Sequence, residues 1–484
     1  MRRQERPILG SDLMRLVTAG MYDEPLALYR EYLQNSADAV AEAGCNGSVR
    51  IHIDARNFRV RIRDEGPGLS PEEAVERLIP IAQSTKCRSR DRGFRGIGRL
   101  VGLAFGEAVS FTTQSSGSES ATRVNWDACR LRESYGGGGD GRIRECITVE
   151  SLPREEDARH FFEVEVRGIA RHAAGSVLNR DKVRQYIGEI CPVPLSSDFP
   201  FSPQVQRLVG PDLFGLNVTI DGDDVPITRP YGTGVRFADD REDPFREIRT
   251  FELPAVDARR AAAGWVAHTS YLGTVPKGAA IRGIRARAGN IQVGTENVFA
   301  HLFNEERFNR WAVGEVHVLD PRIVPNGRRD YFEPGPHVRN LENHLGAIFR
   351  RLSARCRTTS VTRARERRYV RSLEELEDAY RLAKSGYLAA PNAWVMIREA
   401  RVKLREICEV TEEAYGGNTE IGRRIEALQW ELEHFKARRG RPRLGNVQGR
   451  EISTYRKVFS SVARAAHTPR MARRIIEDVI AQNS

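Results

Sequence analysis

The first part of the chain alternates between stretches of helical and of strand periodicity. Apolar residues follow a helical spacing over residues 11–40 and alternate with polar ones over residues 48–53 and 58–63. Ser70 and Pro71 begin a further helix, because serine is a good N-cap and proline suits the first turn. Further alternating stretches lie at residues 108–113, 122–126, 145–150 and 161–166. This order predicts an antiparallel sheet with helices on one face.

The pattern changes twice along the rest of the chain. A proline-rich passage, residues 191–203, predicts a connection between two domains. Beyond it we expect strands at residues 216–220, 264–269, 281–294 and 311–320, and a helical patch at residues 298–303. From residue 337 the residues Arg, Glu, Leu and Ala dominate, which predicts helices at 339–368, 373–385, 393–414, 421–438 and 453–483.

At 484 residues the chain is too long for a single core. We therefore predict the α+β class with three domains, residues 1–205, 206–336 and 337–484: a sheet with helices on one face, an α/β domain and a helical region.

Composition sets outer limits on the function. Hydrophobic residues make up 40% of the chain and charged ones 29%, as in soluble globular proteins. No apolar run has the length of a signal peptide core or a membrane span, so we expect a cytoplasmic protein without membrane contact. Seven scattered cysteines without a CxxC pair support neither a disulfide framework nor a zinc site. The net charge of +11 admits a nucleic-acid partner, although ATP sites and arginine-rich helices raise it too.

Three polar residues mark the segment 28–39 as a candidate site. Glu31, Asn35 and Asp38 follow the spacing i, i+4 and i+7, so on a helix they form one stripe, while the apolar residues pack inward. A glutamate there can take a proton from water, and a neutral asparagine oxygen suits Mg²⁺ that also binds phosphates. A solvated polar helix face is the alternative interpretation of this stripe.

Two glycine-rich turns accompany that helix. Asp64 ends a predicted strand, where a carboxylate can accept from an exocyclic amine, and Gly66 and Gly68 let the backbone approach a planar base. Residues 93–105 form a glycine-rich loop that opens an apolar helix, which is a seat for phosphate. Each motif is weak alone, but the ordered triple is specific. The sequence contains no GxxxxGK[ST] motif, and the third motif lacks the βαβ context of a dinucleotide fold.

This triple resembles the motifs of the GHKL ATPases: the gyrase, heat-shock-90, histidine kinase and MutL superfamily. The resemblance implies a Bergerat-type ATP-binding sandwich, with ATP and Mg²⁺ as ligands. Glu31 would be the general base, Asn35 would hold Mg²⁺, and Asp64 would bind the adenine amino group. Residues 81–86 resemble the start of a mobile lid. The remaining ATP-binding residues implied are Asp38, Gly66, Gly68, Ser84, Thr85, Lys86, Gly93, Arg95, Gly96, Ile97, Gly98 and Arg99.

Two positions depart from the family pattern. The fourth motif usually carries Gly-Thr before a strand, whereas this chain has Arg159-His160, so we expect His160 to stand in for the threonine. Arg77 occupies the place of an asparagine that precedes the lid in the chaperones. Both departures bear on base specificity more than on phosphate chemistry. The glycine run at residues 136–141 is interpreted as a loop between strands, because no helix follows it directly.

The second domain resembles the middle domain of heat-shock-90 chaperones, down to a loop of the form asparagine-x-x-arginine-acid at residues 326–330. That resemblance implies that Arg329 contacts the γ-phosphate, with Arg328 as the second candidate. A guanidinium fork grips phosphate oxygens and stabilises charge that develops in phosphoryl transfer. The alternative is a surface arginine pair in a turn. The basic segment 436–443 is interpreted as a solvated hinge or a polyanion contact.

Two function classes remain open. The first is an ATP-hydrolysing conformational clamp of the heat-shock-90 type, a homodimer with a protein client or partner subunit. The second is an ATP-gated nucleic-acid-binding module of MutL or MORC type in bacterial defence or repair. A histidine kinase is a distant third, because no phosphoacceptor helix precedes the ATP domain. Stimulation of ATP turnover by nucleic acid, with its salt dependence, separates the first two.

Overall fold

The structure is a computed structural model that describes residues 22, 24–44, 47–81, 98–133, 145–237, 240–411, 420–437 and 451–482. The chain divides into two compact units, residues 1–357 and 358–484. The first unit contains two large sheets and a two-stranded one with their helices, and the second contains helices in its described part, so the predicted α+β class with a helical C-terminal region is confirmed. The division into three domains stays a prediction.

The first sheet has seven strands in the order β5-β4-β3-β6-β2-β1-β7. All neighbours are antiparallel except β1 and β7, which pair parallel, so the sheet is mixed. The predicted strands are confirmed, and the one expected at residues 216–220 joins this sheet. The strands are β1 (Ser48–Asp54), β2 (Arg59–Asp64), β3 (Ala108–Gln114), β4 (Ser120–Asp127), β5 (Ile147–Pro153), β6 (Phe161–Arg167) and β7 (Asn217–Ile220).

Helix α2 (Ala27–Ala43) packs its apolar face into the core of this sheet through Leu28, Leu33 and Val40. The helix starts later than predicted: residues 24–26 precede it and include Pro25, while residues 11–21 lie outside the described part of the chain. Helix α3 (Pro71–Leu78) has the predicted serine cap, completed by a capping box with Glu73. The other helices of this part are α4 (Gly102–Phe105), α5 (Ala128–Glu133), α7 (Arg171–Val177), α8 (Arg180–Ile190) and α9 (Ser202–Val209).

The second sheet has five strands in the order β10-β11-β14-β12-β13, and its central strand β14 is buried along its whole length. Apolar clusters cover both faces, one of them completed by Leu341, Leu345 and Phe349 from the start of α10. The stretch 281–294 forms two strands rather than one, because Asn290 turns the chain with a φ of 65°. The strands are β10 (Glu247–Pro254), β11 (Arg260–His268), β12 (Gly283–Ala288), β13 (Ile291–Val293) and β14 (Val313–Val318), beside the hairpin β8 (Gly234–Arg236) and β9 (Glu242–Pro244). Within the stretch 298–303, only Ala300–Leu302 form a 3₁₀ turn.

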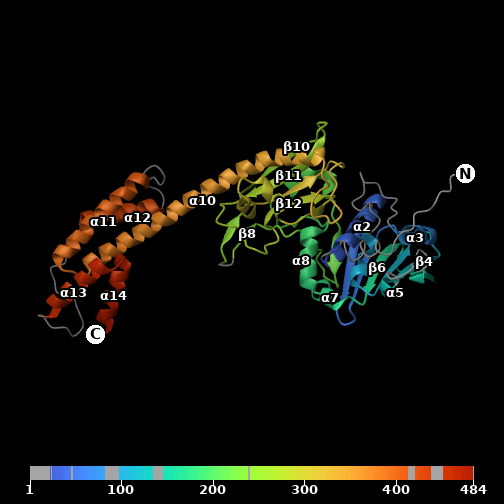
Figure 1. Cartoon of the computed structure of the whole chain (residues 1–484), viewed down its shortest axis with the longest axis horizontal. Helices are drawn as coiled ribbons and strands as arrows, with labels where there is room; N and C mark the ends of the chain where they lie inside the picture. Colours follow the sequence, from blue (N-terminus) through green and yellow to red (C-terminus); the bar gives the residue numbers. More distant parts are fainter. Residues whose placement is uncertain are drawn as a thin grey trace. The chain divides into compact units, whose positions relative to one another are not determined.

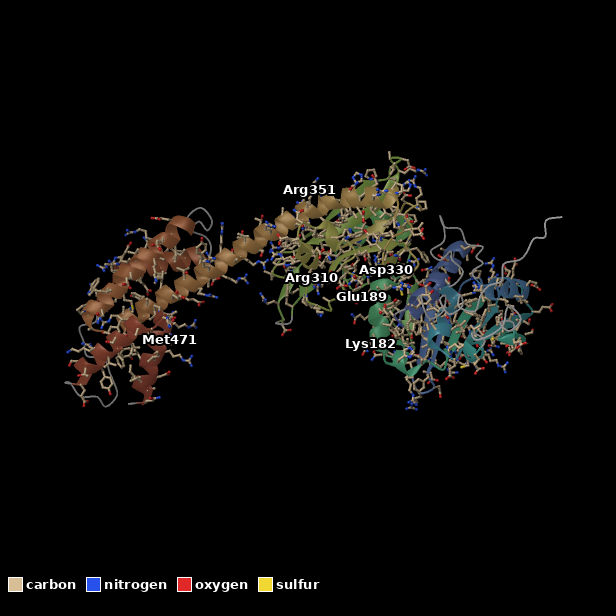
Figure 2. The ribbon with its side chains drawn as sticks, in the orientation of Figure 1. Lys182, Glu189, Arg310, Asp330, Arg351 and Met471 are labelled. Carbon is tan, nitrogen blue, oxygen red and sulfur yellow. The ribbon has the colours of Figure 1, made fainter. Side chains whose placement is uncertain are left out.

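The proline-rich passage is packed rather than a free linker. Phe199 packs against Trp265 of β11, with 5.2 Å between the ring centroids and an angle of 39° between the ring planes. Just before the passage, Glu189 lies at the end of α8 (Figure 2). Its backbone carbonyl accepts a hydrogen bond of 2.8 Å from Arg287, and its side-chain carboxylate lies 3.3 Å from Arg285, so the end of α8 contacts the second sheet. The two sheets of the first unit are therefore joined by polar contacts through α8.

Helix α10 (Pro336–Lys384) is one continuous helix (Figure 1), so the helical stretches predicted at 339–368 and 373–385 are confirmed, but they form a single helix rather than two. The residues between them include neither glycine nor proline, and nothing there ends a helix. The last predicted helix is two, because Thr468 caps α14 through the Met471 amide and Pro469 occupies its first position. The other C-terminal helices are α11 (Ala390–Thr411), α12 (Glu420–Glu433), α13 (Glu451–Ala465) and α14 (Pro469–Gln482). In the described residues, no helix is long and apolar enough to cross a membrane.

Candidate active site

The first and third sequence motifs meet at Glu31 on α2. The Glu31 side chain is only 11% exposed, and its Oε1 accepts hydrogen bonds of 3.1 and 3.0 Å from the Arg30 guanidinium. Burial opposes the charge of Arg30, but the Glu31 carboxylate outweighs this effect and the pKa of Arg30 is raised. A Cβ on Gly98 would stand 2.4 Å from Glu31 Oε2. Only glycine therefore lets the third motif approach the carboxylate this closely.

The second motif meets the first at Asp64, the last residue of β2. Its carboxylate accepts a hydrogen bond of 2.7 Å from Ser36 of α2 and one of 3.0 Å from the Gly66 amide. Burial raises the pKa of Asp64 to about 6, although both hydrogen bonds act in the opposite direction. A buried carboxylate of this kind can accept a further hydrogen bond from a ligand amine.

The turn after β2 is held by side chains from β3 and from the start of β6. Gly68 has a φ of 68°, and a Cβ on it would stand 2.0 Å from the Gln114 carbonyl oxygen, so the position requires glycine. The Leu69 amide donates to Thr113 Oγ1 at 2.8 Å. His160 Nδ1 lies 2.7 Å from the Gly66 carbonyl oxygen. The side chain of His160, at the place of the family threonine, therefore contacts the backbone of the second motif.

Tyr32 fastens the third motif to α2. Its hydroxyl donates to the Arg99 carbonyl at 3.1 Å and accepts from the Gly102 amide at 3.1 Å. The Arg99 guanidinium donates to the Pro80 carbonyl, and burial lowers the pKa of Arg99 to about 10. The start of the short helix after the glycine loop is thereby fixed against the helix that carries Glu31.

The loop with Arg329 is a built turn rather than an irregular one. Asn326 Nδ2 donates to Asp330 Oδ1 at 2.5 Å, and the Asp330 amide returns a bond of 3.2 Å to the Asn326 side chain. Arg329 has a φ of 57°, a left-handed conformation that costs an arginine about 1–2 kcal/mol. A hydrogen bond of 2.7 Å from the Gly294 amide to the Arg329 carbonyl stabilises this conformation. Backbone strain of this kind clusters at functional sites.

Tyr22 connects this loop electrostatically with the site on α2. Burial raises the pKa of the Tyr22 phenol, the Glu31 charge raises it further, and Arg30 and Arg329 act in the opposite direction. Both Glu31 and Arg329 therefore lie within electrostatic range of one phenol.

The remaining predicted residues divide into two groups. On α2, Asn35 is half-buried and Asp38 is buried. Arg77 donates to Glu73 at 3.2 Å on the surface of α3. The other predicted site residues lie outside the described part of the chain, as does the loop at residues 136–141: Ser84, Thr85, Lys86, Gly93, Arg95, Gly96 and Ile97.

The donors around Glu31 fit Mg²⁺ that arrives with a nucleotide. Asn35 lies one turn from Glu31 on the same helix face, and it offers a single neutral oxygen. Mg²⁺ commonly takes one or two protein oxygens and completes its shell with phosphates and water. The described residues contain no cluster of three His, Cys, Asp or Glu side chains for a metal held by the protein alone.

Sequence reasoning missed Arg30, Ser36 and Thr113. Ser36 directly follows Asn35 and lies on the face of α2 that packs on the sheet, where a serine among apolar positions was the available signal. Thr113 is fully buried at the end of β3, and only strand pairing brings it to the turn after β2. Nothing local in the sequence around Thr113 indicates this contact.

A helix that carries Glu31 and Asn35 lies against a strand-end aspartate and glycine turns on a mixed sheet, and this arrangement resembles the ATP-binding domain of the GHKL class. A family model described as Histidine kinase-, DNA gyrase B-, and HSP90-like ATPase matches residues 27–135. The chaperone protein HtpG of Acinetobacter baylyi is 26% identical over 166 residues, which cover 29% of this chain and 25% of the relative. The DNA mismatch repair protein MutL of Microcystis aeruginosa is 32% identical over 123 residues, which cover 25% of this chain and 20% of the relative.

HtpG of Alcanivorax borkumensis is 24% identical over 204 residues, which cover 37% of this chain and 30% of the relative. The resemblance to the GHKL ATPases and their heat-shock-90-like branch is confirmed by these matches. The aligned parts of the chain span only 20–30% of the length of these curated relatives. The similarity therefore concerns the ATPase module, and it does not extend to the relatives as whole proteins.

Proposed function

We propose that the chain is an ATP-hydrolysing conformational clamp of the heat-shock-90-like type. In this proposal ATP orders the lid at residues 81–86, the N-terminal domains of two copies pair, and water attacks the γ-phosphate. The observation that carries it is the convergence of Glu31, Asp64 and Gly98 around α2, three residues from three separate motifs.

Each end of the nucleotide has a counterpart in the proposed pocket. The adenine amine donates to Asp64, whose carboxylate is already oriented by Ser36 and the Gly66 amide. In this proposal the phosphates bind at the third motif, whose described residues Gly98 and Arg99 lie beside α2. Mg²⁺ held by Asn35 would neutralise phosphate charge. Asp38, buried one turn further along α2, supports this end of the helix.

Glu31 has the chemistry of the general base. Its carboxylate accepts a proton from the attacking water while the water oxygen forms a bond to the γ-phosphorus. The bond between the γ-phosphorus and the β–γ bridging oxygen breaks, and ADP leaves with the electron pair of that bond. The ion pair with Arg30 orients the carboxylate through Oε1 and leaves Oε2 facing Gly98 of the third motif. The support for this role is geometric, because Oε2 points to the loop that would hold the phosphates.

Arg329 is proposed to contact the γ-phosphate from the second sheet. The supporting observation is the shared electrostatic influence of Glu31 and Arg329 on Tyr22, together with the strained turn that presents Arg329. A guanidinium at the γ-phosphate stabilises charge in the transition state. Loss of the γ-phosphate on hydrolysis would release the contact between the Arg329 loop and the nucleotide site.

The pair Arg328 and Arg329 tests this clamp. We expect Arg329→Ala to bind ATP normally and to hydrolyse it at least about 10²-fold more slowly, because arginines at this position act mainly in the transition state. Arg328→Ala, one residue away in the same loop, is the matched control and should hydrolyse ATP at the wild-type rate. Calorimetric titration with a non-hydrolysable analogue and a phosphate-release assay measure the two quantities. Equal turnover in both variants would contradict the role of Arg329.

A further inference from the structure

An arginine-rich part of α10 stands apart from the cores of the protein. Residues 358–371, here called the arginine segment, contain five arginines, one glutamate, and neither lysine nor aspartate. No side chain in this segment is buried, and Val361 is 46% exposed. Burial resumes at Leu373, which joins the core of the C-terminal helices. The segment is therefore a helix that no packed face stabilises.

Within the described residues, four arginines of the segment lack the partners that other arginines have. In the second unit Arg424 binds Glu377 at 2.9 Å and Arg473 binds Asp378 at 2.8 Å. By contrast, the described residues offer no ion pair or hydrogen bond to the side chains of Arg365, Arg367, Arg368 and Arg371.

Like charges at this spacing oppose the helix. Arg367 and Arg371 are four residues apart, as are Arg363 and Arg367, and each such pair costs about 0.2–0.5 kcal/mol. An external polyanion would turn this repulsion into attraction, because it supplies the counter-charges that the folded chain does not.

The arrangement of the arginines selects among polyanions. At about 100° per residue, the five guanidinium groups cover about 200° of the helix circumference, and Glu366 lies on the opposite side. Val361 and Val370 lie on opposite sides of the helix, so the segment has no apolar face for a bilayer. The guanidinium groups therefore extend from two flanks of the helix. A nucleic-acid duplex matches this arrangement, because its groove admits a helix and has phosphates along both sides.

We propose that the arginine segment binds the phosphate backbone of double-stranded nucleic acid, with Arg365, Arg367, Arg368 and Arg371 as the contacts. The interaction reads charge rather than base sequence, because guanidinium contacts with phosphates carry no sequence information. It does not depend on the proposed ATP hydrolysis, since the segment belongs to the second unit and Glu31 to the first. Four phosphate contacts give a salt slope of about −3.6 in log K against log salt.

The test uses the full chain, a fluorescein-labelled DNA duplex and anisotropy at 50 and 200 mM salt. We expect wild-type affinity to fall about 10²-fold between these salt concentrations. The variant Arg365→Gln/Arg367→Gln/Arg368→Gln/Arg371→Gln should bind weakly and lose most of this salt dependence. The matched control removes four arginines that are 67–82% exposed and have carboxylate partners, and it should bind like wild type: Arg130→Gln/Arg249→Gln/Arg259→Gln/Arg307→Gln.

Three outcomes would overturn the proposal. They are equal loss of duplex binding in the control variant, binding to anionic vesicles or poly-glutamate in place of the duplex, and no binding at either salt concentration. Cross-linking of a thiothymidine-labelled duplex to the wild-type chain gives a measurement that needs no variant, and cross-links should map to residues 358–371. Glu31→Ala should bind the duplex like wild type, so failure of duplex binding and failure of ATP hydrolysis are separate results.

Discussion

At the scale of single residues, Asp64 owes its chemistry to burial. Burial raises the pKa of Asp64 to about 6, so in the nucleotide-free fold its neutral form persists to a higher pH than that of an exposed aspartate. Because the folded-state pKa lies above the usual carboxyl value, Asp64 contributes stability at low pH that is lost as the pH rises through about 6. Binding has the opposite sign, since an amine donates more strongly to the ionised carboxylate.

Adenosine binding is therefore expected to strengthen as the pH rises from 5 to 7. With a pKa of about 6, the ionised fraction of Asp64 rises about tenfold over this range, and the affinity should follow it. Adenosine has no phosphate whose own titration would interfere. Asp64→Asn should bind more weakly and without this pH dependence. Calorimetry across the range measures both, and a pH-independent wild-type affinity would argue against contact between Asp64 and the base.

The residues of the site differ in how far the sequence predicts them. Glu31 and Asn35 follow from helix periodicity, and Asp64 from its place at a strand end, because these are local patterns. Ser36 and Thr113 become visible only when β2 and β3 are brought beside α2 and β6, which no local pattern specifies. His160 was predicted from the place of a missing threonine, and its contact with Gly66 agrees with a position beside the second motif.

At the scale of elements, the second sheet is organised around a buried charge. Glu315 of β14 is fully buried, with Arg229 at 2.5 Å, Arg287 in direct contact, and His317 at 3.1 Å. Burial opposes ionisation of Glu315, but the two arginines outweigh it and hold its pKa well below the usual range. Burial lowers the pKa of His317. Because Arg287 also donates to the Glu189 carbonyl, this cluster fixes the end of α8 against the sheet.

Removing the central charge should destabilise the first unit strongly. Glu315→Gln leaves Arg229 and Arg287 buried without a counter-charge, which typically costs about 3–5 kcal/mol of unfolding free energy. Urea unfolding followed by tryptophan fluorescence measures this, since Trp265 lies on the neighbouring strand β11. Glu252→Gln, at an exposed ion pair with Arg260, is the control and should cost less than about 1 kcal/mol. A similar small cost for both variants would show that the buried cluster contributes little.

The sequence predicted the elements that show clear local periodicity. It predicted poorly where one helix ends and the next begins, because helix ends depend on capping residues, glycine and proline. The strands β1 and β2 and the cap of α3 follow directly from alternation and from Ser70. The false break in α10 was placed at residues 369–372, which include neither glycine nor proline. The break before α14 was missed, although Thr468 and Pro469 are an ordinary helix start.

At the scale of the whole molecule, the proposed nucleotide site on the first sheet acts together with Arg329, which lies on a loop beside the second sheet. The sequence suggested this link only through the family resemblance, because residues about 300 positions apart cannot be placed together by periodicity. The electrostatic influence of Glu31 and Arg329 on Tyr22 supports the link within the first unit. The arginine segment adds a separate polyanion surface in the second unit.

The central claim is that the protein hydrolyses ATP at the site on α2, with Glu31 as the general base. Phosphate release from saturating Mg-ATP by wild type, Glu31→Ala and Glu42→Ala measures it most directly, since Glu42 is an exposed glutamate on the same helix. We predict turnover by wild type and Glu42→Ala, and turnover slower by about 10²- to 10⁴-fold in Glu31→Ala with the nucleotide still bound. Equal turnover in Glu31→Ala and wild type, or no turnover in wild type, would contradict the account.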